Sequence, residues 1–146
     1  FRNSTGYTEG DRGRSFPQKY LWTQCNFGEN SLMLSVAEIP FGPIRFTGVI
    51  GVVLWQGREY RLATYLGARA VKIGRGEAVI RQGDSVLSVR LMEKHPHPLL
   101  APAGGIMNRT IHESAACTAA YCFQQKGKTI FNLQTPKASF EYEYPD

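Results

Sequence analysis

Three carboxylic acids in the sequence lie beside aromatic or apolar residues, where they could exchange protons. Glu9 and Asp11 are two positions apart in YTEGDRG, and Glu113 lies in TIHES among apolar and small residues. Burial against an aromatic wall disfavours the charged carboxylate and raises its pKa, so such an acid can protonate an alkene near neutral pH. The alternative is that Glu9 and Asp11 are exposed turn residues and that Glu113 pairs with an arginine.

The segment YLWTQCNF, residues 20–27, follows the acidic turn and supplies an aromatic surface. Side chains alternate on a strand, so Tyr20, Trp22, Gln24 and Asn26 would share one face. Aromatic rings can stabilise a developing carbocation, and neutral amides can hold a hydroxyl group or a water molecule. We expect this face to line a pocket for a mostly apolar ligand. The alternative is that the rings belong to a core and the amides bond to backbone.

Other catalytic and metal-binding patterns are weak. His95 and His97 lie two apart in HPHP, but no third ligand with suitable spacing accompanies them, so we predict no metal site. A serine hydrolase of the α/β type would need a GxSxG turn between a strand and a helix, and the sequence has none. No cofactor is predicted.

Turn residues recur every eight to twelve positions, which is typical of an all-β domain. The segments between them are rich in β-branched and aromatic residues and predict about nine or ten strands. ESAACTAAYCF, residues 113–123, is predicted as a strand, and EKHPHPLLAPAGG, residues 93–105, as a loop because of its three prolines. The predicted fold class is an antiparallel, lipocalin-like (calycin-type) barrel whose lumen could hold one small ligand.

Length and cysteine content place limits on the class of protein. A chain of 146 residues forms one domain that can bury a core without a disulfide or metal. Its three cysteines, Cys25, Cys117 and Cys122, are odd in number and form no CxxC pair, which favours a reducing compartment and a cytoplasmic location. No apolar run long enough for a membrane helix is present.

The formal net charge of +5 could indicate an anionic partner. The basic residues are scattered among acids, however, and no helix or run concentrates them, so we predict no nucleic-acid binding. Weak peripheral contact with an anionic membrane surface stays open, since a protein that handles lipid-like substrates would meet them there.

Four sequence blocks together resemble the C-terminal half of tocopherol cyclase-like proteins. They are GYTEGDRGRSFPQKYLWTQCNF, SLMLSVAEIPF with RFTGVIGVVLWQGREYRLATY, PLLAPAGGIMNRTIHES, and the final ASFEYEY. Their order and spacing cover nearly the whole chain. Gly10 and Arg12 depart from the family, which usually has Lys and Trp there, so substrate or activity would differ.

The resemblance implies that residues 1–146 are the C-terminal barrel of a longer protein built from two lipocalin-like barrels. The expected partners are therefore a missing N-terminal half or a second copy of this chain, which would cover an apolar patch. In the family, members cyclise or hydrate prenylated and polyene molecules. Because fold transfers better than chemistry, a non-catalytic carrier of a hydrophobic ligand remains the alternative.

Within this resemblance Glu9 is the leading proton donor, with Asp11 or Glu113 as the alternatives. Tyr20, Trp22, Gln24 and Asn26 would bind the substrate. A catalytic acid should face the lumen beside Trp22, whereas a carrier can leave all three carboxylates outside. Replacement of Glu9 by Gln is expected to cost about a hundredfold in rate if Glu9 is the donor.

Overall fold

Ten antiparallel strands and one short 3-10 helix make up most of residues 5–145, the part of the chain that the computed structural model describes. The all-β fold predicted from the turn spacing is confirmed. The elements are β1 (Tyr20–Phe27), β2 (Asn30–Phe41), β3 (Ile44–Trp55), β4 (Arg58–Ala63), η1 (Thr64–Leu66), β5 (Arg69–Gly74), β6 (Glu77–Gln82), β7 (Ser85–Glu93), β8 (His97–Ala103), β9 (Ile106–Gln125) and β10 (Lys128–Tyr142).

Tight two-residue turns connect several neighbouring strands. The pairs Gln56-Gly57, Arg75-Gly76 and Lys126-Gly127 all have positive φ at both positions, between 50° and 74°. Two consecutive left-handed residues are the mark of a type I′ turn, whose twist matches that of a β-hairpin. A glycine at the second position makes each turn inexpensive, because it has no Cβ to clash. These turns fix the register of the β3–β4, β5–β6 and β9–β10 hairpins.

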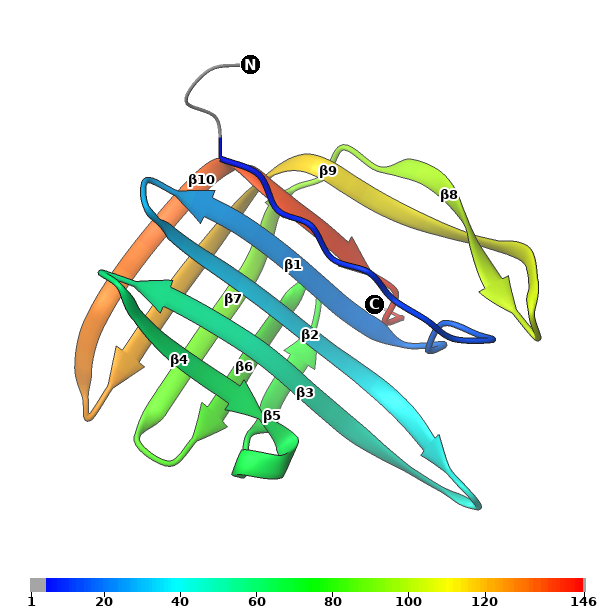
Figure 1. Ribbon diagram of the computed structural model, residues 1–146, viewed down its shortest axis with the longest axis horizontal. Coiled ribbons are helices and arrows are strands. Elements are labelled where there is room, and N and C mark those ends of the chain that lie inside the picture. The colour runs from blue at the N-terminus through cyan, green and yellow to red at the C-terminus, as the bar shows by residue number, and fades with distance from the viewer. Residues whose placement is uncertain (1–4, 146) are drawn as a thin grey trace.

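The strands form one curled sheet in the order β4-β3-β2-β1-β10-β9-β7-β6-β5. The pairing of β1 with β10 joins the two ends of the described chain and places Trp22 opposite Glu141. In Figure 1 the strands β1–β4 lie in front and β5–β7 lie behind, so the sheet folds over on itself. The result is a barrel-like shape with the interior between these two layers.

The barrel is not closed by strand pairing, because within the described residues β4 and β5 are each paired on one side only. The side chain of Gln82, the last residue of β6, reaches across to β4 instead. Its Oε1 accepts a hydrogen bond from Ala63 N at 3.0 Å, and its Nε2 donates to Arg61 O at 2.9 Å. One amide thereby satisfies a donor and an acceptor on the exposed edge of β4, as a neighbouring strand would.

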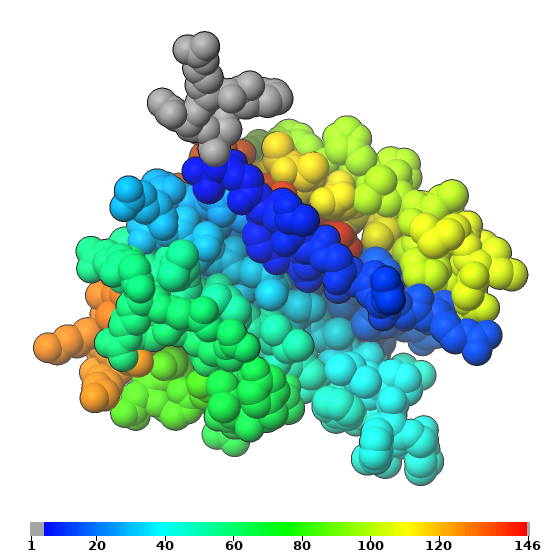
Figure 2. All heavy atoms as spheres, in the orientation of Figure 1, coloured from blue at the N-terminus to red at the C-terminus, as the bar shows by residue number. Residues whose placement is uncertain are grey.

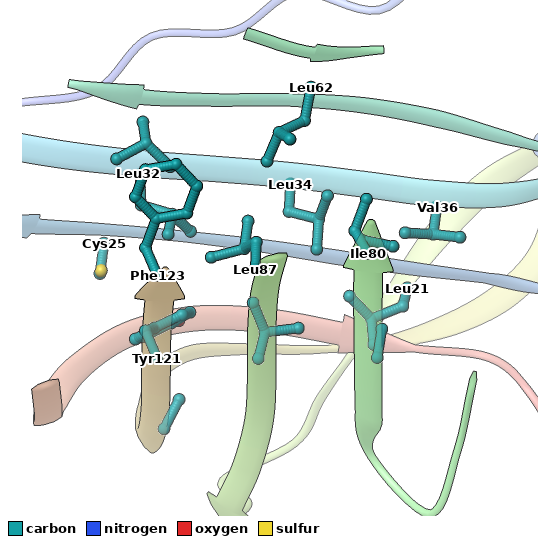
Figure 3. Packing of buried hydrophobic residues seen from close by; sticks show 14 of the residues in the cluster. Leu21, Cys25, Leu32, Leu34, Val36, Leu62, Ile80, Leu87, Tyr121 and Phe123 are labelled. Atoms are coloured by element: carbon teal, nitrogen blue, oxygen red, sulfur yellow. The ribbon is translucent and has the colours of Figure 1, made fainter. Parts of the chain in front are cut away.

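The interior is filled by apolar side chains from both layers. Leu21, Leu34, Leu87 and Phe123 are fully buried. Figure 3 shows residues of β1, β2 and β4 meeting residues of β6, β7 and β9 in this core. Burial on this scale is the main source of stability for a domain of this size.

The proline-rich segment 93–105 differs from expectation, because His97–Ala103 forms strand β8 rather than a loop. Among the strands of residues 5–145, β8 pairs with β9 alone, so it is an edge strand. An edge strand tolerates Pro98 and Pro102 where the missing N–H would face away from the partner. The alanine-rich segment 113–123 lies inside the 20-residue strand β9, as predicted.

Among the helices of residues 5–145, none is long and apolar enough to cross a membrane.

Candidate functional site

The two faces of β1 point to different environments. Leu21 and Cys25 point into the packed interior, whereas Tyr20 and Trp22 point to the outer face of the sheet. The expectation that Trp22 faces a lumen is therefore wrong. Core side chains occupy the interior at this level, and the space beside Trp22 lies outside the barrel.

Residues 7–17, called here the N-terminal strap, run along the outer face of β1 (Figure 1). The end of the strap next to β1 is bonded to the β8–β9 hairpin. Phe16 N donates to Pro102 O at 3.1 Å, and Gly105 N donates to Arg14 O at 2.7 Å. The Arg109 guanidinium also donates to Pro17 O at 2.6 Å. These bonds hold the strap at a fixed distance from the sheet.

Glu9 joins the middle of the strap to the aromatic strand. One of its oxygens, Oε2, accepts hydrogen bonds from Tyr7 OH at 2.5 Å and from Trp22 Nε1 at 3.0 Å. The rings of Tyr7 and Trp22 lie 6.4 Å apart, and Phe16 meets Tyr20 edge-to-face at 6.2 Å. Aromatic contacts of this kind favour a defined arrangement of strap and strand.

A pocket of about 470 Å³ lies between the strap and strands β1, β2 and β10. In Figure 2 a hollow is visible beside the blue strap, with red atoms of the C-terminal segment at its base. Its volume falls in the range of about 300–1,000 Å³ that small-molecule sites occupy. Its lining combines aromatic rings, three carboxyl groups and small residues: Tyr7, Glu9, Asp11, Arg12, Gly13, Ser15, Phe16, Pro17, Tyr20, Trp22, Ser35, Ala37 and Glu141.

Glu141 is the acid that the sheet itself contributes to this pocket. Its Oε2 accepts a hydrogen bond from Tyr20 OH at 2.6 Å. Burial is the largest cause of a raised pKa at Glu141, and the hydrogen bond from Tyr20 opposes the rise. Burial, together with the Glu141 carboxyl, also raises the pKa of the Tyr20 hydroxyl. Both groups therefore hold their protons more tightly than they would in water.

Other carboxylates surround Glu141. Glu113 is its direct partner across β9 and β10, and Glu143 follows two residues later, just after the end of β10. The charges of Glu113, Glu143 and Asp11 all raise the pKa of Glu141. Glu143 is partly neutralised, because it lies 3.7 Å from the Arg109 guanidinium. The strap, β9 and the segment after β10 therefore place negative charge around one acid.

The structure brings some of the sequence-predicted residues together. Glu9, Asp11, Tyr20 and Trp22 all line the pocket. Glu113 does not line it but lies beside Glu141 on the neighbouring strand.

The two predicted amides lie apart from the pocket. Gln24 Nε2 donates to Asn26 Oδ1 at 2.9 Å, so the amides bond to each other on β1, and neither lines the pocket. His95, just before β8, and His97, its first residue, are both exposed. Residues 5–145 contain no group of three or more His, Cys, Asp or Glu side chains placed to hold a metal ion.

Sequence reasoning missed Glu141, although the sequence carried a signal for it. In SFEYEY, residues 139–144, aromatic residues alternate with Glu141 and Glu143. On a strand this alternation puts both acids on one face and the aromatic rings on the other. An acidic face on a C-terminal strand that pairs with the aromatic β1 would have placed Glu141 beside Trp22. The pairing of β1 with β10 was the missing information.

Comparisons with protein-family models, with curated proteins and with solved structures find no match for this chain. The resemblance to tocopherol cyclase-like proteins therefore stays a prediction.

Proposed function

We propose that this protein binds an apolar small molecule, of the prenylated or polyene class, in the pocket under the strap and promotes its cyclisation or hydration with acid. The observation that carries the proposal is the combination, in one pocket, of two aromatic side chains of β1 with a shielded carboxyl group. Tyr20, Trp22 and Glu141 supply it. Aromatic faces can stabilise a cation that forms after proton transfer to an alkene.

The side chains that line the pocket support an apolar ligand with a polar end. Phe16, Pro17 and Ala37 contribute apolar surface, and Ser15 and Ser35 contribute hydroxyl groups. A few polar groups on a largely apolar wall can orient such a ligand without a metal ion. A geranylgeranyl-substituted hydroquinone and the polyene alcohol retinol both have this character and serve as probes.

The first test of the proposal is binding. Trp22 lies in the pocket, whereas Trp55 packs against Phe27 and Phe131 elsewhere. In a Trp55→Phe background, the remaining Trp22 fluorescence should be quenched by either probe in a saturable way. An Ala37→Trp variant fills the pocket and should weaken binding at least tenfold, whereas Ala116→Trp, at an exposed position of β9, should not. Absence of saturable quenching by both probes would contradict the proposal.

A non-catalytic carrier is the second candidate function, and one observation favours it. Glu9, Asp11 and Glu113 all lie outside the barrel interior, and Glu9 already accepts two hydrogen bonds from neighbouring side chains. A carrier needs only the pocket. Incubation of either probe with the protein in D2O separates the two functions, because acid-promoted cyclisation or hydration would introduce one deuterium from solvent into the product, whereas a carrier returns the probe unchanged.

A further inference from the structure

We propose that Glu141, rather than Glu9, is the general acid of this pocket, and that Glu9 is a positioning residue that holds the strap against Trp22. This inference rests on the proposed function and assigns its chemistry to a residue of the sheet. Glu141 lines the pocket from β10 and shares a hydrogen bond with Tyr20. Glu9 is exposed and reaches Trp22 from the strap.

The two acids differ in how their oxygens are used. Glu9 Oε2 accepts from both Tyr7 and Trp22, so this oxygen is committed to contacts between strap and strand. Glu141 Oε2 accepts from Tyr20 alone, and within residues 5–145 its Oε1 has no hydrogen-bonding partner. That oxygen can therefore carry a proton for a ligand in the pocket.

The surroundings of Glu141 favour the protonated carboxyl group. It faces Glu113 from β9, Glu143 from the segment after β10 and Asp11 from the strap, and only the hydrogen bond from the Tyr20 hydroxyl of β1 opposes them. Two arginines belong to these surroundings: Arg12 of the strap lines the same pocket, and the Arg109 guanidinium is paired with Glu143. A carboxyl group among several carboxylates cannot ionise as readily as an isolated one. Desolvation acts in the same direction.

The proposed step is balanced without an oxidant or reductant. Glu141 donates its carboxyl proton to one carbon of a substituted alkene, and the π electron pair of the alkene forms the new C–H bond. The cation left on the other carbon lies against the rings of Tyr20 and Trp22. It is captured by a phenol oxygen of the same molecule, or by water, with formation of a C–O bond. The proton released from that oxygen returns to the Glu141 carboxylate.

The test measures deuterium incorporation into the geranylgeranyl hydroquinone and into retinol in D2O, together with binding by Trp22 fluorescence. Glu141→Gln should lower the rate at saturating probe by about a hundredfold or more, the usual scale for loss of a general acid, with binding changed less than threefold. Glu141→Asp should recover part of the rate. Glu9→Gln should weaken binding and lower the saturated rate less than tenfold. Glu29→Gln, in the exposed β1–β2 turn, is the matched control and should change neither.

The pH profile adds a readout that a structural role for Glu141 would not move. The wild-type rate should fall as pH rises through the pKa of Glu141, and this fall should be absent from the residual rate of Glu141→Gln. A full rate in Glu141→Gln, or a hundredfold loss in Glu9→Gln alone, would overturn the assignment and leave the proposed function standing. Binding without deuterium incorporation by the wild type would overturn the assignment and leave a carrier. Absence of binding would overturn both.

Discussion

Strand β1 separates two regions of opposite character within a single run of residues. On its inner face Thr23 and Cys25 are fully buried in the core. On its outer face Tyr20 and Trp22 border a pocket that opens to solvent beneath the strap. The interior provides stability through close packing, whereas the outer face leaves room for a ligand.

The polar groups of the two regions also differ in their surroundings. In the interior, Thr23 Oγ1 and Tyr121 OH hydrogen-bond at 2.6 Å, and Thr23 also donates to Ser139 O at 2.9 Å. Burial raises the pKa of the Cys25 thiol to about 12, so this cysteine stays neutral. On the outer face, by contrast, Glu141 and Glu113 are placed side by side. Like charges placed close together oppose folding, and such clusters are typical of functional sites.

The largest loss of stability should come from a cavity in the interior. Phe123 is fully buried and packs against Tyr60 and Phe131, with ring centroids 5.1 and 5.9 Å away. Phe123→Ala should lower the free energy of unfolding by about 3–5 kcal/mol, since it removes buried surface and leaves a cavity. Urea denaturation followed by circular dichroism measures this. Phe41→Ala, at a position 70% exposed, is the control and should change stability by less than about 0.5 kcal/mol. Equal losses in the two variants would contradict the division into a stabilising interior and an outer face.

A smaller loss of stability should come from removal of the Gln82 side chain, which bonds to the edge strand β4. Gln82→Ala removes both hydrogen bonds to the β4 backbone and should cost about 1–2 kcal/mol in the free energy of unfolding. Hydrogen exchange of the Ala63 amide should speed up in parallel, because its acceptor is lost. Gln134→Ala, an exposed glutamine on β10, is the matched control. Unchanged exchange at Ala63 would show that the glutamine bridge does not hold the edges together.

The fold was largely predictable from sequence because its signals are local. Gly57, Gly76 and Gly127 occupy turns that need positive φ, and the segments between turns carry strand-forming residues. The error at segment 93–105 arose because proline excludes a central strand but not an edge strand, and edge position depends on the pairing of the whole sheet. The hydrogen bond between Gln82 and Ala63 likewise depends on two residues 19 positions apart in the chain meeting in space.

The candidate site was predictable only in part because it depends on long-range pairing. Tyr20 and Trp22 share a face, as alternation requires, but the sequence does not tell which face of a strand is the interior when both are largely apolar. In the structure Leu21 and Cys25, on the opposite face of β1, point into the interior. Glu141 lies in the pocket because β1 pairs with β10, and this pairing joins positions more than a hundred residues apart.

The smallest expected change in stability is the pH dependence that Glu141 contributes. It is also the most direct test of the outer face. Because its pKa is raised by burial and by neighbouring carboxylates, the folded state binds the Glu141 proton more tightly than the unfolded state does. The stabilising contribution of this proton is present at low pH and is lost as pH rises through the folded pKa. Gln imitates the protonated acid at every pH and still accepts from Tyr20.

Glu141→Gln should therefore match the wild type near pH 4 and become the more stable protein as pH increases toward 8, as measured by urea denaturation at each pH. The effect is smaller than those at Phe123 and Gln82, because Glu141 keeps part of its surface in water, where charge is screened. Glu59→Gln, which replaces an exposed acid on β4, is the control and should show no such divergence. If the wild type gained stability over Glu141→Gln as pH rises, the carboxylate would be the favoured form in the folded protein, and Glu141 could not be the acid of the pocket.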